Sequence, residues 1–221
     1  MAKKELTPEE ITQIAIDLQN SKSEKRRSAA KKIGKHHLVQ LGDELYNAYL
    51  IERKDTRTWE TQVEMIKALG KIKFIQAIKQ MAEVIQNPNS DSATTTAATI
   101  AYIRLKRCDN NDVKPIIDLI SKNPSRSVID GSLSILAFDD IKPPKEQINV
   151  ILNFVKKMEE YLDNSYIKGT TDPRIHVLSA STNWDQNNPE LQEFINNASQ
   201  NPRCNQYMDR ILKGKKVPYG E

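Results

Sequence analysis

Cysteine, glycine and aromatic residues are scarce in this chain. Its 221 residues include 2 Cys and 7 Gly, and only 6% are Phe, Trp or Tyr. A balance this poor in glycine and aromatic side chains favours helices over a β-sandwich or β-barrel. Cys108 and Cys204 lie far apart in the sequence and neither belongs to a CxxC pair. Their spacing supports neither a metal site nor a redox dithiol, so we expect two unpaired thiols.

Long apolar runs are also missing. No run approaches the roughly 18 apolar residues that a membrane-spanning helix requires, and the first ten residues, MAKKELTPEE, lack the apolar stretch of a secretory signal. We therefore expect a cytoplasmic protein with no membrane partner. No phosphate-binding loop or dinucleotide fingerprint occurs in the sequence, so we expect no cofactor.

What the chain does contain is a series of amphipathic segments with helical spacing. The first opens at Thr7, where Pro8 suits the first helical position and Glu10 completes a capping box, and it predicts a helix of about 13 residues. Further helices are predicted over residues 23–34, 38–53, 55–73, 74–87, 90–107, 111–124, 124–140, 144–163, 172–184, 188–199 and 202–216. The pattern of helix, short turn and helix indicates an all-α protein.

The segments repeat. Ile33–Gly34 recurs as Leu69–Gly70, 36 residues later, and Asn87–Pro88 recurs as Asn123–Pro124 at the same interval. A period of this size is typical of a solenoid, in which each helix pair packs on its neighbours. We therefore predict a single domain over residues 1–221. It would consist of an N-terminal capping helix (1–21), four helix-pair repeats (22–163) and a degenerate last repeat with a cap (164–221).

Two stretches carry a family resemblance. SEKRRSAAKKIG and WETQVEMIKALGKIKFIQAIKQMAEVI resemble HEAT-repeat proteins of the bacterial HEAT-like kind, in which a first helix ends near Ala-Leu-Gly and a second begins with residues such as Phe-Ile-Gln-Ala-Ile. The resemblance implies a right-handed α-solenoid (superhelix) of about five helix pairs, whose second helices tend to line a concave surface that holds a partner. Repeats of this kind define a fold and leave the function open.

Basic residues are concentrated near residues 23–37. On a helical wheel Ala29, Ala30 and Ile33 form the buried side, and Arg27, Lys31 and Lys35 follow one another on the outer side. This surface is either a cationic binding site or the solvated face of an ordinary helix. Basic residues at the ends of later first helices, where they also interact favourably with the helix dipole, would extend it. Nine residues make up this candidate site, the basic stripe: Lys25, Arg27, Lys31, Lys32, Lys35, Lys67, Lys71, Arg104 and Arg107.

Two functions follow from this sequence. The first is a non-enzymatic scaffold or adaptor that grips a protein partner, for example as an inhibitor or immunity protein for a toxin; we expect it to be a monomer. The second is a nucleic-acid binder that uses the basic stripe. The chain also resembles, in length and helix-pair design, the HEAT-like alkylation-repair DNA glycosylases, which hold a lesion with tryptophans and an acidic residue. Trp59 and Trp184 are the only tryptophans, and Asp55 and Asp185 are their nearest acids.

Other constellations favour structural roles. Trp59 lies on the apolar side of its predicted helix, so we expect it in the core. His36 and His37 are adjacent on a helix, point about 100° apart, and have no third ligand, so no metal is expected. His176, Ser179, Ser181 and Asp185 include the residue types of a hydrolase, but no nucleophile elbow or glycine-rich oxyanion loop accompanies them.

Overall fold

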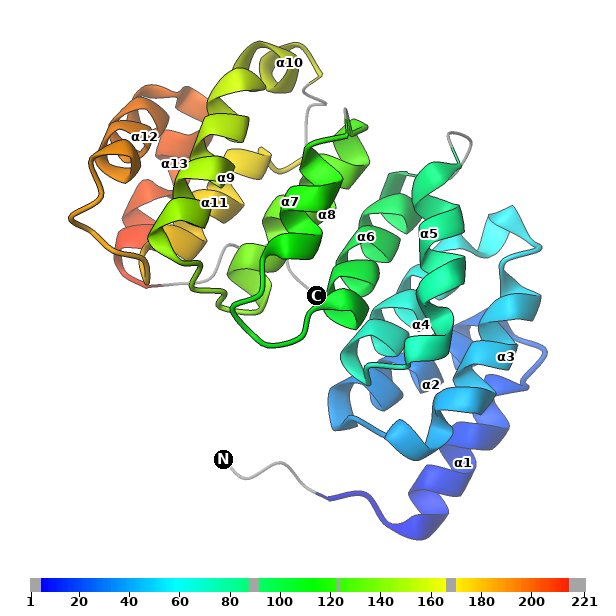
Figure 1. The fold of residues 1–221 in the computed structure, drawn as a ribbon. Helices are drawn as coiled ribbons and strands as arrows, with labels where there is room; N and C mark the ends of the chain where they lie inside the picture. Colours follow the sequence, from blue (N-terminus) through cyan, green and yellow to red (C-terminus); the bar gives the residue numbers. More distant parts are fainter. Residues whose placement is uncertain (1–4, 88–91, 123, 166–169, 215–221) are drawn as a thin grey trace. The chain divides into compact units, whose positions relative to one another are not determined.

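The computed structural model describes residues 5–87, 92–122, 124–165 and 170–214, and these residues form helices without any β-strand (Figure 1). The predicted all-α class is confirmed. The α-helices are α1 (Pro8–Leu18), α2 (Ser23–His36), α3 (Gly42–Glu52), α4 (Trp59–Lys71), α5 (Ile78–Gln86), α6 (Ser92–Lys106), α7 (Lys114–Ile120), α8 (Arg126–Phe138), α9 (Lys145–Lys157), α10 (Glu159–Asn164), α11 (Pro173–Ser181), α12 (Pro189–Gln200) and α13 (Pro202–Leu212). Short 3₁₀ helices at Val39–Leu41, Thr56–Thr58 and Ile75–Ala77 precede α3, α4 and α5.

The chain divides into two compact units, Met1–Leu105 and Lys106–Glu221. The division falls at the last residue of α6, inside the predicted third helix pair. Two of the residues that mark the predicted repeat, Pro88 and Asn123, lie outside the described part of the chain.

The first helix begins with the predicted capping box. The backbone N–H of Glu10 donates to the Thr7 hydroxyl at 3.2 Å, and the backbone N–H of Thr7 donates to the Glu10 carboxylate at 2.8 Å. Pro8 occupies the first helical position, where its missing N–H leaves no bond unmade. The helix spans 11 residues and buries Ile14 and Leu18 against the first unit.

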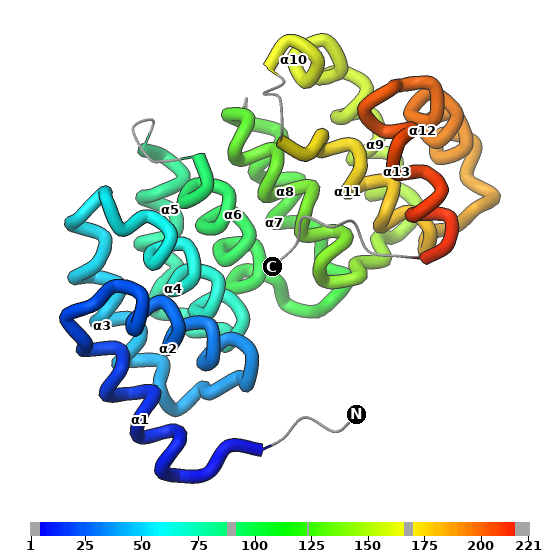
Figure 2. Tube along the Cα trace, turned by 180° about the vertical axis from the view of Figure 1, so that it is seen from behind, coloured from blue at the N-terminus to red at the C-terminus, as the bar shows by residue number. Residues whose placement is uncertain are grey.

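In the first unit the first helices of successive pairs lie side by side, α2 against α4 (Figure 2). The repeated glycines lie at close contacts between neighbouring helices. A Cβ atom at Gly34 would be 3.2 Å from Cα of Ala68, and one at Gly70 would be 2.8 Å from Cα of Ala101 in α6. Glycine at these positions lets the backbones approach one another. The prediction that a helix ends at Gly34 is wrong, because α2 continues to His36.

Three helices end in the same way. His37, Lys73 and Asp140 follow α2, α4 and α8 with positive φ angles of 53°, 54° and 49°. In each case the next residue donates its backbone N–H to the carbonyl five positions back. The pairs are Leu38 to Ile33 (3.1 Å), Phe74 to Leu69 (3.0 Å) and Ile141 to Leu136 (3.0 Å). This is the Schellman turn, which satisfies carbonyls that the helix end leaves open.

The second unit also packs through helix pairs. Helix α8 lies against α11, and α9 lies against α12 (Figure 1). The predicted long helix over residues 144–163 is broken at Met158, which separates α9 from α10. Trp184 is buried after α11, and its indole N–H donates to the carbonyl of Ile141 at 2.9 Å.

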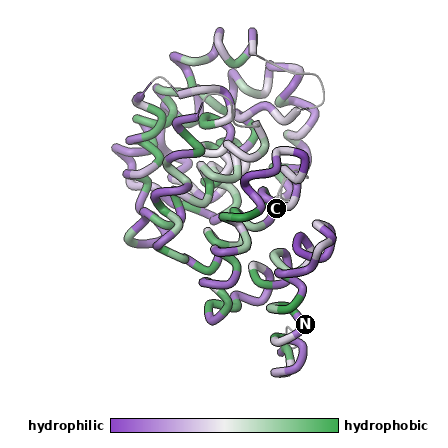
Figure 3. The backbone as a smooth tube through the Cα atoms, turned by 90° about the vertical axis from the view of Figure 1, so that its right-hand side faces the viewer, coloured by the Kyte–Doolittle hydropathy of each residue, from purple (hydrophilic) through white to green (hydrophobic). Residues whose placement is uncertain are grey.

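Green apolar and purple polar stretches are intermingled along the chain, as the colouring by hydropathy shows (Figure 3). In α6, Thr94, Thr95 and Ala98 are buried. Both cysteines are unpaired, as expected, with Cys108 exposed and Cys204 buried. Within the described residues, no helix is both long and apolar enough to span a bilayer.

Candidate functional site

The exposed part of the basic stripe lies on α2. Its exposed residues are Lys25, Lys31, Lys32 and Lys35. The opposite face of the helix is buried in the core through Ala29, Ala30 and Ile33. Lys25, Lys31 and Lys32 have no salt-bridge partner among the residues that the structure describes. Arg27 forms an ion pair with Glu60 of α4, so part of its charge is neutralised.

Lys67 and Lys71 continue the basic stripe on α4. Each follows a residue of α2, Lys31 and Lys35, by 36 positions. The side chain of Lys71 packs against α2. Its Cδ atom lies 3.4 Å from the position that a Cβ atom on Gly34 would occupy. Lys67 is half-buried and forms an ion pair of 3.4 Å with Glu64.

Arg104 and Arg107 are not part of the exposed surface. Their side chains are buried, with the residues 6% and 8% exposed, and Arg107 forms an ion pair with Asp139. Arg107 therefore has a structural role that its position at the end of α6 did not reveal. The surface available to a polyanion in the first unit is smaller than the nine residues of the basic stripe.

Arg26, from the same basic segment, has a purely structural role. Its guanidinium bonds both carboxylate oxygens of buried Glu52 in α3, at 2.5 and 2.9 Å, and the carbonyls of Asn20 and Ser21 at 2.6 and 2.9 Å. Hydrogen bonding to Glu52 raises the pKa of Arg26. These bonds tie α2 and α3 to the end of α1. The four residues that form these bonds also line a hollow of about 320 Å³ in the first unit.

A second hollow, of about 210 Å³, lies in the second unit between α9 and α12. We call it the α9–α12 groove. Its apolar lining comes from residues spaced three or four positions apart, which places them on one side of each helix. These residues are Leu152 and Val155 of α9 and Phe194 and Ala198 of α12.

Charged residues surround this apolar lining. Lys156 of α9 and Glu193 of α12 form an ion pair of 2.8 Å across the α9–α12 groove, and hydrogen bonding to Glu193 raises the pKa of Lys156. Glu159 and Glu190 also line the groove. Sequence reasoning did not identify this site, because its parts come from segments about 40 residues apart that have no shared motif.

Arg174 of α11 also lines the groove, although its side chain is only 4% exposed. Its guanidinium donates to Asp172 at 2.6 and 2.9 Å and to Asp163 at 2.6 Å. Burial alone would lower the pKa of Arg174, but the hydrogen bonds to Asp172 and Asp163 outweigh it and raise the pKa. The charge of Arg174 is therefore fixed and already matched by carboxylates.

The buried histidine and cysteine of the second unit do not resemble an activated pair. Burial lowers the pKa of His176 to about 4 and raises the pKa of Cys204 to about 12. A nucleophilic cysteine needs the opposite shifts, toward thiolate and imidazolium. His176 packs edge-on against the ring of Phe138, and the hydroxyl of Ser181 donates to the carbonyl of Leu178. The Nδ1 atom of His176 is buried without a hydrogen-bond partner among the described residues.

Residues considered for metal binding or lesion recognition are also placed by the structure. Among the described residues, no group of three or more His, Cys, Asp or Glu side chains could hold a metal ion. Trp59 was predicted to be in the core, but it begins α4 at the surface and is 41% exposed, so that prediction is wrong. Asp55 caps the following turn and binds Arg57, which lowers the pKa of Asp55 to about 2.

Comparison with known proteins leaves the HEAT resemblance as a prediction. No family profile matches this chain, and no characterised protein or solved structure is detectably similar to it.

Proposed function

We propose that this chain is a non-enzymatic helical-repeat scaffold of the HEAT type that holds a protein partner on its surface. In this proposal its repeats are the five helix pairs α2–α3, α4–α5, α6–α7, α8–α9 and α11–α12, wound right-handed, with α1 and α13 as end helices. The protein would act as a cytoplasmic monomer, for example as an inhibitor or immunity protein.

One observation carries the proposal: the same packing device occurs twice in the first unit. Gly34 and Gly70, 36 residues apart, each face an alanine of the next first helix, and each is followed by a Schellman turn. A stack built this way offers long surfaces made by several helices, and such surfaces suit gripping a partner better than enclosing a small substrate.

The experiment is purification of the tagged full-length chain from its native host, followed by measurement of the mass of the complex. The proposal predicts a protein partner in fixed stoichiometry with one copy of this chain. Recovery of the chain alone, at both low and moderate salt, would overturn it.

A second candidate function, nucleic-acid binding, is favoured by a separate observation. Lys25, Lys31 and Lys32 are exposed and form no ion pair among the described residues, so they can contact phosphates at little electrostatic penalty. Binding of this kind would weaken steeply as salt is raised and would be largely independent of base sequence.

The test is fluorescence anisotropy with labelled duplex DNA over a salt series. Changing Lys25, Lys31 and Lys32 to Glu should abolish binding, whereas the same change at three exposed lysines of the second unit, Lys142, Lys145 and Lys157, should not. Absence of binding at low salt would eliminate this candidate. Release of an alkylated base from the duplex would be the specific readout for the glycosylase variant of this function.

A further inference from the structure

The α9–α12 groove combines an apolar floor with an excess of carboxylates. Leu152, Val155 and Ala198 are almost fully buried, and Phe194 beside them is half-buried. The volume of about 210 Å³ lies below the range of roughly 300–1,000 Å³ that is usual for cofactor and small-molecule pockets. A groove of this size suits one or two side chains of a bound peptide better than a whole cofactor.

The charges around the groove predict the sign of its ligand. Five carboxylates lie on or next to the groove, and three cations accompany them. The carboxylates are Glu159, Asp163, Asp172, Glu190 and Glu193, and the cations are Lys156, Arg174 and Arg203. Each cation is already paired: Lys156 with Glu193, Arg203 with Asp163, and Arg174 with Asp163, Asp172 and, at 3.8 Å, Glu159. Glu190 has no ion-pair partner among the described residues. The uncompensated charge is negative, so it favours a cationic ligand.

Two side-chain amides complete the site. Asn153 of α9 and Asn197 of α12 line the groove, are exposed, and have no hydrogen-bond partner among the described residues. An amide offers two donor hydrogens and an acceptor oxygen, and this matches the alternating donors and acceptors of a peptide main chain.

We propose that the α9–α12 groove binds a peptide segment of a protein partner in which a large apolar residue is flanked by Lys or Arg. The apolar side chain occupies the floor, Glu190 and the exposed Glu193 on the same helix receive the cation, and Asn153 and Asn197 hold the peptide main chain. This inference rests on the proposed scaffold function and adds the chemistry of the partner and its place on the chain.

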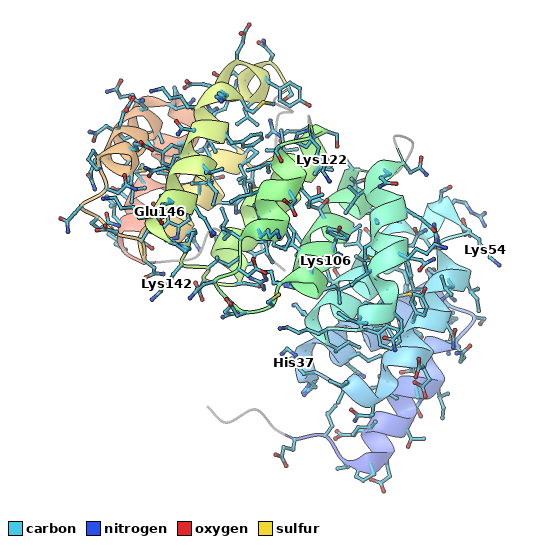
Figure 4. All side chains as sticks on the ribbon, viewed as in Figure 1. His37, Lys54, Lys106, Lys122, Lys142 and Glu146 are labelled. Atoms are coloured by element: carbon cyan, nitrogen blue, oxygen red, sulfur yellow. The ribbon has the colours of Figure 1, made fainter. Side chains whose placement is uncertain are left out.

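The test is selection of random peptides, displayed on phage, against the immobilised full-length chain. Enriched peptides are then synthesised with a fluorescent label, and their affinities are measured by anisotropy. The test variant is the double change Glu190→Lys and Glu193→Lys. The matched control is Glu146→Lys, because Glu146 is exposed in the first turn of α9 as Glu190 is in the first turn of α12, but it does not line the groove (Figure 4).

We expect enriched peptides in which Lys or Arg stands within two residues of Leu, Ile, Met or Phe. They should bind the wild-type chain and Glu146→Lys equally, and bind the double variant about tenfold more weakly or worse. The variant should still fold, because the Lys156–Glu193 pair that it removes is exposed to solvent and such pairs contribute little to stability. Circular dichroism and thermal melting check this.

Three results would overturn the proposal: no enriched peptide, enriched peptides without a cation, or equal binding to the double variant. The outcome separates this proposal from the scaffold function. A stoichiometric partner from the native host whose affinity is unchanged by the double variant would leave the scaffold function standing and remove the groove assignment. Cationic peptides that bind the groove, with no partner in the host, would support the groove chemistry and count against the scaffold function.

Discussion

Arg26 of α2 holds Glu52 of α3 in a two-point ion pair, with Nε 2.5 Å from Oε2 and Nη2 2.9 Å from Oε1. The side chain of Glu52 is only 2% exposed. A carboxylate at this position is stable only while a cation matches it, since an unpaired buried charge is strongly unfavourable. The pair therefore fixes how α2 and α3 meet.

Removal of the Arg26 guanidinium should lower the free energy of unfolding far more than removal of the guanidinium of its neighbour Arg27. We expect Arg26→Ala to lower the free energy of unfolding by about 3 kcal/mol or more, because Glu52 stays buried without its partner. Arg27→Ala is the control, and it should change stability by about 1 kcal/mol or less, because its partner Glu60 is largely exposed. Urea unfolding followed by circular dichroism measures both. Equal effects would show that Glu52 is not held by Arg26 in solution.

At the repeated glycines, replacement by alanine should change stability in the opposite direction from the one that helix propensity predicts. Alanine normally stabilises a helix by about 1 kcal/mol relative to glycine. At Gly70, however, a new methyl group would lie 2.8 Å from the backbone of Ala101, so we expect Gly70→Ala to destabilise the chain by about 1–3 kcal/mol. Gly34→Ala, with its nearest approach at 3.2 Å, should have a smaller effect. A chain stabilised by Gly70→Ala would contradict the close packing of α4 on α6.

The Schellman turns offer a stabilising change. Lys73 is exposed and holds a left-handed backbone with φ of 54°, which is unfavourable for an L-residue by about 1–2 kcal/mol. Lys73→Gly should therefore raise the free energy of unfolding by about 0.5–1 kcal/mol. The gain is no larger because glycine has a greater conformational entropy in the unfolded chain, and this offsets part of it. Lys32→Gly, at an exposed interior position of α2, should lower it by about 1 kcal/mol. Loss of stability in Lys73→Gly would contradict the left-handed conformation.

His176, which is buried, and Asp130, which is partly buried, have opposing effects on stability between pH 4 and 6. Burial lowers the pKa of His176 from 6.5 to about 4, so the unfolded chain binds the proton more tightly and stability falls as the pH drops from 6.5 toward 4. Burial raises the pKa of Asp130 from 3.8 to about 6, so here the folded chain binds the proton more tightly and stability falls as the pH rises through 6.

These effects should be separable by mutation. In Asp130→Asn the effect of His176 remains, and stability should fall on acidification from pH 6.5 to 4 by up to roughly 3 kcal/mol more than in the wild-type chain. In His176→Gln the slope over the same interval should shift the other way. Unfolding by urea at several pH values measures both slopes. Parallel profiles for the wild-type chain and both variants would show that neither group titrates with a shifted pKa.

Much of the fold could be predicted from local sequence. Thr7, Pro8 and Glu10 act within a single turn, so the start of α1 could be predicted to the residue. The helix ends were harder, because His37, Lys73 and Asp140 adopt the left-handed conformation without being glycine, whereas Gly34 and Gly70 lie inside helices for reasons of packing. Helix propensity alone cannot predict that a glycine lies inside a helix, because its position there depends on a contact with a residue about 30 positions away.

The candidate sites depended still more on tertiary contacts. The charge of α2 was visible in the sequence, but the burial of Arg104, which lies close to Gly70 of α4, and the pairing of Arg107 with Asp139 depend on residues more than 30 positions away. Trp59 follows the apolar pattern of its helix and still lies at the surface. It is the first residue of α4, and the first turn of a helix contacts fewer neighbouring residues than its middle. The α9–α12 groove needs two helices to be seen together, and no single segment predicts it.

We propose that this chain grips a protein partner and neither catalyses a reaction nor binds nucleic acid. The most direct test is cross-linking mass spectrometry on the full-length chain purified from its native host with whatever accompanies it. We expect one stoichiometric protein partner, with cross-links from Lys156 and Lys157 of α9 to an apolar and cationic segment of that partner. A chain that elutes without a protein partner, or one that copurifies with nucleic acid through Lys25, Lys31 and Lys32, would contradict it.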